Sequence, residues 1–163
     1  MIYHLGLGSN LGKRAMNLAR AIRLLGRDGV EVLKASSVYE TEPVDLPGQA
    51  WFLNQALEVR SALDPPSLLR AAKSIETEMK RVPAIPKGPR TIDIDILLAG
   101  SLIIDTPELV VPHPRLSRRN FVLVPLAEIA PGVVHPVLGK TLRELAEASS
   151  DPSKVTMFKR GRR

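Results

Sequence analysis

The chain has 163 residues, of which 44% are hydrophobic and 25% charged, and this composition is typical of one soluble globular domain that buries about two thirds of its unfolded surface. It contains no cysteine, which excludes disulfides and thiolate metal sites. There is no run of about 18 or more apolar residues and no secretory signal pattern at the N-terminus. We therefore expect no membrane span and a cytoplasmic location.

The formal net charge of +6 is concentrated at the C-terminal end. Residues 151–163 hold five basic residues and one aspartate, a charge of +4, which leaves only +2 for the other 150 residues. A basic end of this kind is usually a solvated tail, so we expect it to be dispensable for catalysis. Aromatic residues make up 4% of the chain, and no RNA-binding aromatic motif is present. The charge fits a small polyanion such as ATP better than nucleic acid.

The first half of the chain predicts strands on either side of a helix. Met1 to Gly8 has the pattern of a strand, and the helical periodicity after it ends near Gly26. Residues 30–41 are rich in β-branched and aromatic residues and predict a strand, and residues 52–63 are another strand candidate. The segment between them is rich in turn formers and predicts a loop. Gly6, Gly8 and Gly12 satisfy neither the dinucleotide nor the P-loop fingerprint, so we interpret them as a structural turn and helix cap.

A second helix is predicted from about Pro65 to Arg81. Asp64 can cap its first turn, and proline is tolerated there because the first backbone amides have no partner within the helix. The segment from Val82 to Pro89 has three prolines in eight residues and predicts a loop.

The most informative segment follows this loop, from Lys87 to Gly100, with the sequence KGPRTIDIDILLAG. Isoleucines at 92, 94 and 96 alternate with polar residues, so a strand here sends them to one face and Asp93 and Asp95 to the other. Two carboxylates on one face require a shared cation, a basic partner or open solvent. Oxygen ligands without histidine or cysteine favour Mg²⁺, and Arg90 adds a fork suited to phosphate.

The predicted order β-α-β-β-α-β is that of the ferredoxin-like split βαβ motif, with an antiparallel sheet and both helices packed on one face. A C-terminal extension follows this core. It includes a short strand within Leu102–Asp105, a helix from Phe121 to Ala130, and a last helix opened by the capping box Thr141–Glu144. The near alternation of Val155, Met157 and Phe158 allows one more short strand at a sheet edge.

The strand and the loop before it resemble the signature of the 6-hydroxymethyl-7,8-dihydropterin pyrophosphokinases, which transfer the diphosphate of ATP to a pterin alcohol and release AMP in folate biosynthesis. The matching residues are Gly88-Pro89-Arg90, Asp93-Ile94-Asp95 and Ile96-Leu97. Further matches are GSNLG at 8–12, FLNQAL at 52–57 and VPHPRLSRRNFVLVPLAEIAP at 111–131. The resemblance covers essentially the whole chain, and it implies a single pterin pyrophosphokinase domain over residues 1–163 that acts as a monomer on small molecules.

The resemblance also implies site residues. Asp93 and Asp95 would bind two Mg²⁺ ions that bridge the ATP phosphates, and Arg81 and Arg90 would be catalytic. The residues implied for ATP binding are Glu76, Arg81, Arg90, Ile96, His113 and Arg119. Those implied for pterin binding are Thr41, Val44, Phe52, Asn54, Asp93 and Phe121. Two aromatic side chains suit the faces of a flat heterocycle, and an amide such as that of Asn54 can match its polar edge.

The chain departs from the family in two places. Phe52 stands where the family usually has a hydroxylated aromatic, so a polar contact is lost while stacking remains. The loop before Gly88 is about one residue shorter, lacks the usual tryptophan and has one arginine, which leaves open how it closes over the site.

Two rival interpretations remain at this stage. One is a different Mg²⁺-dependent nucleotidyltransferase, and the other is an RNA-binding ferredoxin-like domain with a basic tail.

Overall fold

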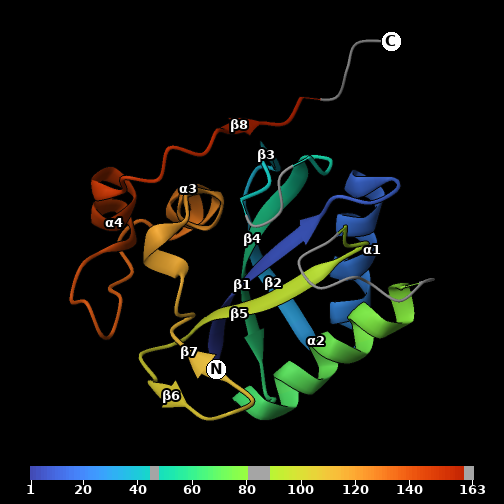
Figure 1. Cartoon of the computed structure of the whole chain (residues 1–163). Helices are drawn as coiled ribbons and strands as arrows, with labels where there is room; N and C mark the ends of the chain where they lie inside the picture. The colour runs from blue at the N-terminus through green and yellow to red at the C-terminus, as the bar shows by residue number, and fades with distance from the viewer. Residues whose placement is uncertain (45–47, 81–88, 160–163) are drawn as a thin grey trace.

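The computed structural model describes residues 1–44, 48–80 and 89–159 as a six-stranded sheet with helices on both faces, and a separate two-stranded hairpin (Figure 1). Within this part of the chain, no helix combines the length and the apolar character that a membrane crossing requires. The elements in chain order are β1 (Ile2–Ser9), α1 (Arg14–Arg27), β2 (Val30–Ala35), β3 (Tyr39–Thr41), β4 (Phe52–Ser61), α2 (Pro65–Met79), β5 (Asp93–Ala99), β6 (Ile104–Asp105), β7 (Val110–Val111), the 3₁₀ turn η1 (Leu116–Arg118), α3 (Asn120–Ile129), α4 (Leu142–Ala148) and β8 (Val155–Met157).

The main sheet is antiparallel and is organised around β1 and β4. Its strand order is β5-β1-β4-β3-β8, and β2 also pairs with β4. The predicted ferredoxin-like order is therefore confirmed, with one difference in residues 30–41. This stretch forms two strands, because the chain leaves the sheet between Ala35 and Tyr39 and then pairs with a different part of β4. Ser36 marks the break, where its hydroxyl accepts a hydrogen bond from the backbone N–H of Ala56 at 2.9 Å.

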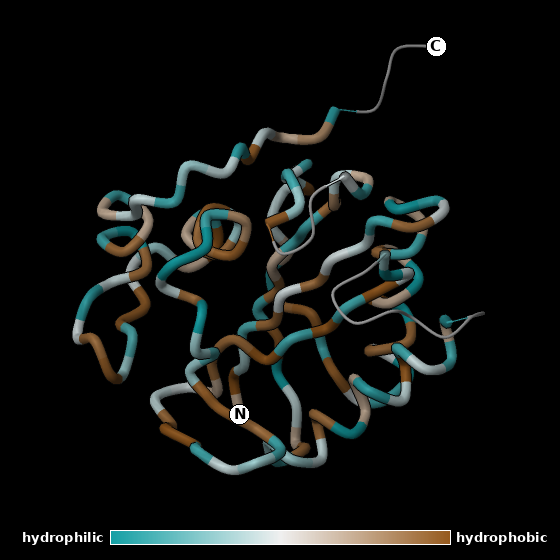
Figure 2. The backbone as a smooth tube through the Cα atoms, in the orientation of Figure 1, coloured by the Kyte–Doolittle hydropathy of each residue, from teal (hydrophilic) through white to brown (hydrophobic). Residues whose placement is uncertain are grey.

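Each face of the sheet has its own hydrophobic core. The first core lies under α1 and α2, as predicted, and includes Leu18, Leu25, Leu68 and Ile75. The second core lies under α3 and α4 on the opposite face (Figure 1). Figure 2 shows hydrophobic residues along the central strands and on α3. Because both faces are covered by helices, the sheet offers no broad open platform within the described residues.

The helix ends follow local side-chain chemistry. Asp64 accepts a hydrogen bond from the backbone N–H of Ser67 at 2.9 Å, which confirms the predicted cap of α2. Thr141 and Glu144 form the predicted capping box of α4. The predicted stop of the first helix at Gly26 is wrong, because α1 continues to Arg27. The turn that follows uses Gly29, whose φ of +82° is a conformation that favours glycine.

The C-terminal extension holds the predicted elements with adjusted limits. The predicted strand within Leu102–Asp105 is reduced to β6, which pairs with β7 in the small hairpin. The helix predicted from Phe121 begins one residue earlier, at Asn120. The optional edge strand is present as β8, which pairs with β3 at the end of the main sheet.

β5 changes its character halfway along. Ile92, Ile94 and Ile96 lie in the first core, and Asp93 and Asp95 lie on the opposite face, as the alternation predicts. The register between β1 and β5 then shifts, so that Leu97 has no partner on β1. This β-bulge allows Leu97 and Leu98 both to join the second core. One face of β5 therefore passes from open carboxylates to buried leucines.

We expect the isoleucine face of β5 to anchor the strand. Ile94→Ala should lower the free energy of unfolding by about 2–5 kcal/mol, because the side chain is 1% exposed and its loss leaves a cavity. The matched control is Ile103→Ala, which should change the unfolding free energy by no more than about 0.5 kcal/mol, since Ile103 is 63% exposed. Urea unfolding monitored by circular dichroism measures both, and equal losses would contradict this assignment.

Candidate active site

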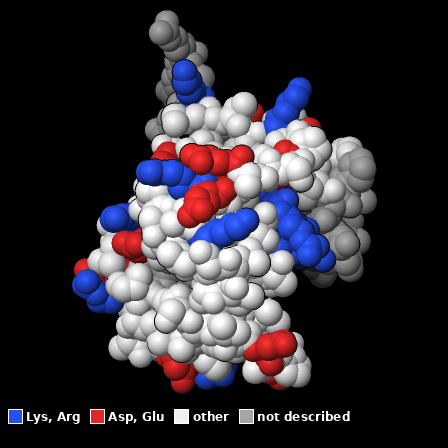
Figure 3. Space-filling model, turned by 90° about the vertical axis from the view of Figure 1, so that its left-hand side faces the viewer, with Lys and Arg blue, Asp and Glu red and all other residues white. Residues whose placement is uncertain are grey.

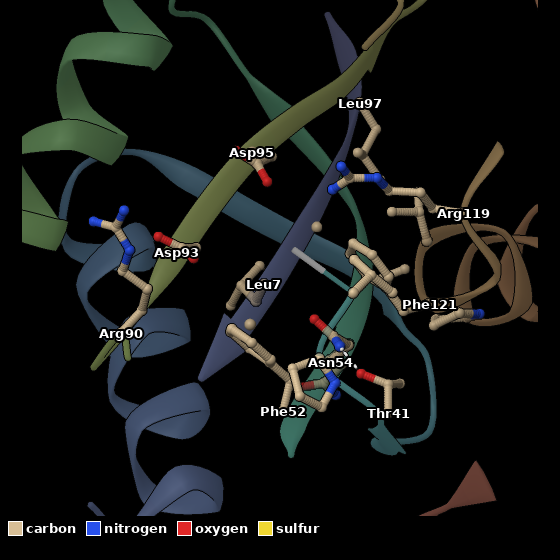
Figure 4. A pocket seen from close by; sticks show the side chains of 18 of the residues that line it. Leu7, Thr41, Phe52, Asn54, Arg90, Asp93, Asp95, Leu97, Arg119 and Phe121 are labelled. Atoms are coloured by element: carbon tan, nitrogen blue, oxygen red, sulfur yellow. Dashed lines mark hydrogen bonds between the residues drawn. The ribbon is translucent and has the colours of Figure 1, made fainter. Parts of the chain in front are cut away.

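A cavity of about 270 Å³ opens on the α3 side of the main sheet (Figure 4). Its floor is formed by β1, β4 and β5, and its walls by the N-terminal part of α3 and the segment after β3. The predicted site residues that line it are Thr41, Val44, Phe52, Asn54, Arg90, Asp93, Asp95, Arg119 and Phe121. The sheet thus brings together residues from five separate stretches of the chain.

The strand register explains why predicted pterin and metal residues meet. Gly8 pairs with Asn54 on one side and with Asp93 on the other, so the three residues form one row across the sheet. Neighbouring strands lie about 4.8 Å apart, which puts the backbones of Asn54 and Asp93 about 10 Å from each other. Gly6 forms the next row with Asp95 and Ala56. The residues predicted to bind two different ligands therefore share one floor.

Two glycines keep this floor open. A Cβ atom on Gly8 would lie 2.7 Å from Oδ1 of Asn54, and one on Gly6 would lie 3.4 Å from Leu97. The sequence interpretation of these glycines as a turn and a cap missed this role. Close approach of a side chain to bare backbone needs glycine, but a single chain gives no signal of which neighbour approaches.

Asn54 is held in place by Thr41. Its amide nitrogen donates a 2.6 Å hydrogen bond to the Thr41 hydroxyl, and both side chains are buried. Phe52 on β4 and Phe121 on α3 line the same cavity. The Arg119 guanidinium lies 5.5 Å from the centre of the Phe121 ring, a cation–π distance. This part of the cavity combines two aromatic side chains with one fixed amide.

The two carboxylates of β5 are close together and uncompensated by ion pairs. The side chain of Asp93 is half-buried, whereas Asp95 is exposed. In the described part of the chain, neither makes a salt bridge or a hydrogen bond through its side chain. Desolvation by the pocket wall, with the negative charges of Asp95 and Glu76, raises the pKa of Asp93 to about 6. Desolvation and the charge of Glu76 also raise the pKa of Asp95.

Glu76 does not line the cavity but lies behind β5. It is 3% exposed, so it is not the ordinary surface residue of a helix. Its carboxylate accepts hydrogen bonds from the backbone N–H of Ile94 and from Nζ of Lys73, both at 3.0 Å. Because β5 ends the sheet, that N–H has no strand partner, and Glu76 supplies the acceptor. Its charge acts across the strand on both aspartates.

The predicted phosphate donors lie at different places around the cavity. Arg90 lines it beside Asp93, and Figure 4 shows the Arg119 side chain extending from α3 toward Asp95. His113 is half-buried outside the cavity lining, where burial and the charges of Arg119 and Arg115 lower its pKa and favour the neutral ring. Arg81 lies outside the described residues, as do residues 82–88 of the predicted loop.

The side chains of Ile96 and Asn10 do not line the cavity, although both residues lie next to it in the structure. The Ile96 side chain is buried in the first core, so only its backbone could reach a ligand. Asn10 was not predicted as a site residue. Its Oδ1 accepts from the backbone N–H of Arg90 at 2.7 Å, and its Nδ2 donates to Oε1 of Gln49 at 2.9 Å. It therefore connects two stretches of the pocket wall that lie far apart in sequence.

A family model described as 7,8-dihydro-6-hydroxymethylpterin-pyrophosphokinase (HPPK) matches residues 4–131, most of the chain. The chain belongs to the HPPK family. Among related sequences, the HPPK of Bacillus subtilis is 43% identical over 97% of this chain and 90% of its own length. The enzyme of Methylorubrum extorquens is 44% identical over 93% of this chain and 95% of its own length.

Other relatives are longer than this HPPK chain. The folic acid synthesis protein fol1 of Pneumocystis carinii is 41% identical over 91% of the chain, which spans 20% of that protein. Among solved structures, Plasmodium falciparum HPPK-DHPS matches with a TM-score of 0.73 and 18% identity, over 90% of this chain and 44% of that one. At this identity the match supports the fold alone.

Family membership defines the reaction. This HPPK is a pyrophosphokinase of folate biosynthesis, and it transfers the diphosphate of ATP to the hydroxymethyl group of 6-hydroxymethyl-7,8-dihydropterin with release of AMP. The cavity by itself can accommodate a flat heterocycle, since two aromatic side chains and a fixed amide line it.

We expect Gly8→Ala to weaken pterin binding by about tenfold or more, because the added methyl group displaces the Asn54 amide from its position. Titration of the pterin by calorimetry, in the presence of an ATP analogue, measures this loss. The control is Gly26→Ala in α1, where a Cβ meets nothing within 4 Å and no loss of affinity is expected. Unchanged pterin affinity in Gly8→Ala would contradict the proposed floor.

The raised pKa of Asp93 makes stability depend on pH in the ligand-free protein. The folded state binds this proton more tightly than the unfolded state, whose pKa is near 3.8, so ionisation destabilises the fold as the pH rises from about 4 to about 6. Asp93→Asn should therefore be more stable than the wild type by about 1 kcal/mol at pH 7, after allowance for solvent screening.

At pH 4 the difference should nearly vanish, because the wild-type carboxyl is then mostly protonated. Urea unfolding at the two pH values measures it. The control, Asp105→Asn, changes an exposed aspartate on β6 and should show no such pH dependence. A stability difference of the same size at both pH values would contradict the raised pKa of Asp93 in the folded protein.

Proposed function

We propose that this HPPK depends on ATP and Mg²⁺, with the phosphates bound over β5 and the pterin bound over β4. The observation that carries the proposal is the row Asp93–Gly8–Asn54, which joins an uncompensated carboxylate pair to a heterocycle-sized pocket. Divalent cations would supply the positive charge that this floor lacks, and they would in turn bind a polyphosphate.

The pterin would bind between aromatic side chains and a polar edge. Phe52 and Phe121 give the flat ring apolar contacts, and the Asn54 amide, fixed by Thr41, presents its oxygen as an acceptor. Val44 is 40% exposed at the rim and can cover the ring once it is bound. Asp93 stands at the other end of the row, where the hydroxymethyl group would meet the phosphates.

Asp93 and Asp95 would hold two Mg²⁺ ions. The donor set fits, because both side chains are carboxylates on the strand face that lines the cavity. Within the described residues, no group of three or more His, Cys, Asp or Glu could hold a metal ion without further ligands. Mg²⁺ takes its remaining ligands readily from phosphate and water. When bound, such ions neutralise charge on the transferred diphosphate and on the leaving AMP.

The chain's own residues would position the phosphates. Arg90 and Arg119 stand on opposite sides of the aspartate pair, and each offers a forked donor for phosphate oxygens. His113, with a lowered pKa, would act as a neutral donor. Arg81 belongs to the same proposal by family resemblance alone. No histidine lines the cavity in the described part of the chain, so we infer that positioning and electrostatics dominate over proton abstraction.

The rival functions lose support. An RNA-binding sheet needs a broad open face with exposed aromatic residues, whereas here α1 and α2 cover one face, and α3 and α4 leave only the cavity uncovered on the other. Figure 3 shows Lys and Arg side chains mixed with Asp and Glu on the α4 side rather than a continuous basic surface.

We propose one domain over residues 1–163 that works as a monomer, because the cavity walls described here need no second copy. Use of ATP supports a cytoplasmic location.

Removal of either carboxylate should abolish the reaction. We expect Asp93→Ala and Asp95→Ala to lower kcat/KM by several orders of magnitude, since each tenfold loss corresponds to about 1.4 kcal/mol of lost transition-state stabilisation. The measurement is AMP release from ATP in the presence of the pterin alcohol and Mg²⁺. Both proteins should remain folded, because neither side chain belongs to a hydrophobic core.

The control for this experiment is Asp105→Ala, an exposed aspartate on β6, which should keep wild-type activity. Near-native AMP release by both active-site variants would refute the metal assignment. A wild-type protein that forms no AMP with the pterin would refute the proposed reaction itself.

A further inference from the structure

The N-terminus of α3 lacks a cap from its own first residues. Arg119 occupies the N-cap position and makes no side-chain capping hydrogen bond. Serine, threonine, aspartate and asparagine are the residues that normally accept from the free amides there. Arg119 instead lines the cavity, with its guanidinium above the Phe121 ring. The position that suits the site is therefore poor for the helix.

Asp151, far along the chain, supplies the missing acceptor. Its Oδ2 accepts from the backbone N–H of Asn120 at 2.8 Å, and its backbone carbonyl accepts from the Asn120 side chain at 3.0 Å. Its Oδ1 accepts from the backbone N–H of Ser153 at 2.9 Å. Although burial alone would raise it, the pKa of Asp151 is lowered by the Asn120 and Ser153 donors, so an anion faces the helix N-terminus.

The chain after Asp151 then continues to the opposite wall of the site. The backbone N–H of Lys154 donates to Oε1 of Glu42 at 2.9 Å, and the Glu42 N–H donates back to the Lys154 carbonyl at 3.2 Å. β8 pairs with β3, with Val155 opposite Thr41. Figure 1 shows this segment passing from α4 over α3 to the edge of the sheet at β3. Thr41 and Glu42 both line the cavity.

A second hollow marks where the segment meets both walls. It has a volume of about 320 Å³ and adjoins the first, since Val44 and Arg119 line both. Asp151 and Ser153 complete its lining together with Arg115 and Arg118. The lining of this hollow thus comes from the segment that begins at Asp151, from the residues just before α3 and from the segment after β3.

We propose that residues 151–158, here called the C-terminal strap, hold the two walls of the active site at a fixed spacing, and that Asp151 is the positioning residue for Arg119 and Phe121. This replaces the expectation that the whole segment 151–163 is a dispensable tail. The consequence for catalysis rests on the proposed roles of Arg119 and Phe121 as ligands of ATP and pterin, whereas the strap itself rests on contacts alone.

Asp151→Ala tests the proposal through kinetics. We expect the KM values for ATP and pterin to rise and kcat to fall, with kcat/KM reduced about tenfold to a hundredfold. The reason is that Arg119 and Phe121 are still present but are displaced from their positions in the cavity. Asp151→Asn keeps an oxygen that can accept from Asn120 and should recover much of this loss. The matched control is Glu144→Ala, which removes the capping box of α4 away from the cavity and should leave KM and kcat unchanged.

Hydrogen exchange of the ligand-free protein separates the strap from the reaction. We expect Asp151→Ala to accelerate amide exchange at the first turn of α3 and along β3, while Glu144→Ala accelerates exchange only in α4. Wild-type kinetics in Asp151→Ala, or exchange at β3 that stays as slow as in the wild type, would overturn the strap. If the wild type forms no AMP, the proposed function fails, and the exchange data still decide on the strap.

Discussion

The cost of ionising two partly desolvated carboxylates on one strand face is the constraint on which the rest of the site depends. Desolvation, together with the charge of Glu76, raises the pKa of both Asp93 and Asp95, so their ionised forms destabilise the ligand-free fold. The strand that carries them is kept in place by the isoleucines on its other face, which pack in the first core. At its outer edge, Glu76 accepts a hydrogen bond from the backbone N–H of Ile94. Stability obtained by burial on one face thus maintains an unfavourable charge pair on the other, where we propose that a cation and phosphates bind.

The cavity lies where the two cores meet. Under α1 and α2 the sheet is fully packed, while on the other face α3 and α4 cover only part of it. The β-bulge at Leu97 marks the limit on β5, since Asp93 and Asp95 before it line the cavity, whereas Leu97 and Leu98 are buried in the second core. Glycines on β1 keep the uncovered part shallow enough for a ligand to reach the sheet. Incomplete coverage of one sheet face is therefore what creates the site.

Several polar side chains hold the walls of this site together over long sequence distances. Asn10 connects Arg90 to Gln49, and Asp151 connects the start of α3 to the C-terminal strap. The bonds from Arg90 to Asn10 and from Asn120 to Asp151 each satisfy a backbone amide, so losing either bond leaves that amide without its acceptor. Other residues thus satisfy the backbone amides beside Arg90 and Arg119, whose side chains both line the cavity.

The sequence by itself determined the local features of this protein. Hydrophobic periodicity predicted the strands and helices, and the caps at Asp64 and Thr141 followed from partners three residues away. The alternation around Asp93 and Asp95 located the carboxylate face, and the family resemblance named nine of the residues that line the cavity. These predictions succeed because the responsible interactions lie within a few residues of each other along the chain.

Only the tertiary structure decided which distant residues meet. The row Asp93–Gly8–Asn54 depends on the register of three strands, and the burial of Glu76 depends on β5 being an edge strand. The contact of Asp151 with Asn120 spans 31 residues and carries no sequence motif. Register, edge position and long-range hydrogen bonds arise from how the elements pack, and packing depends on all of the side chains together rather than on any one segment.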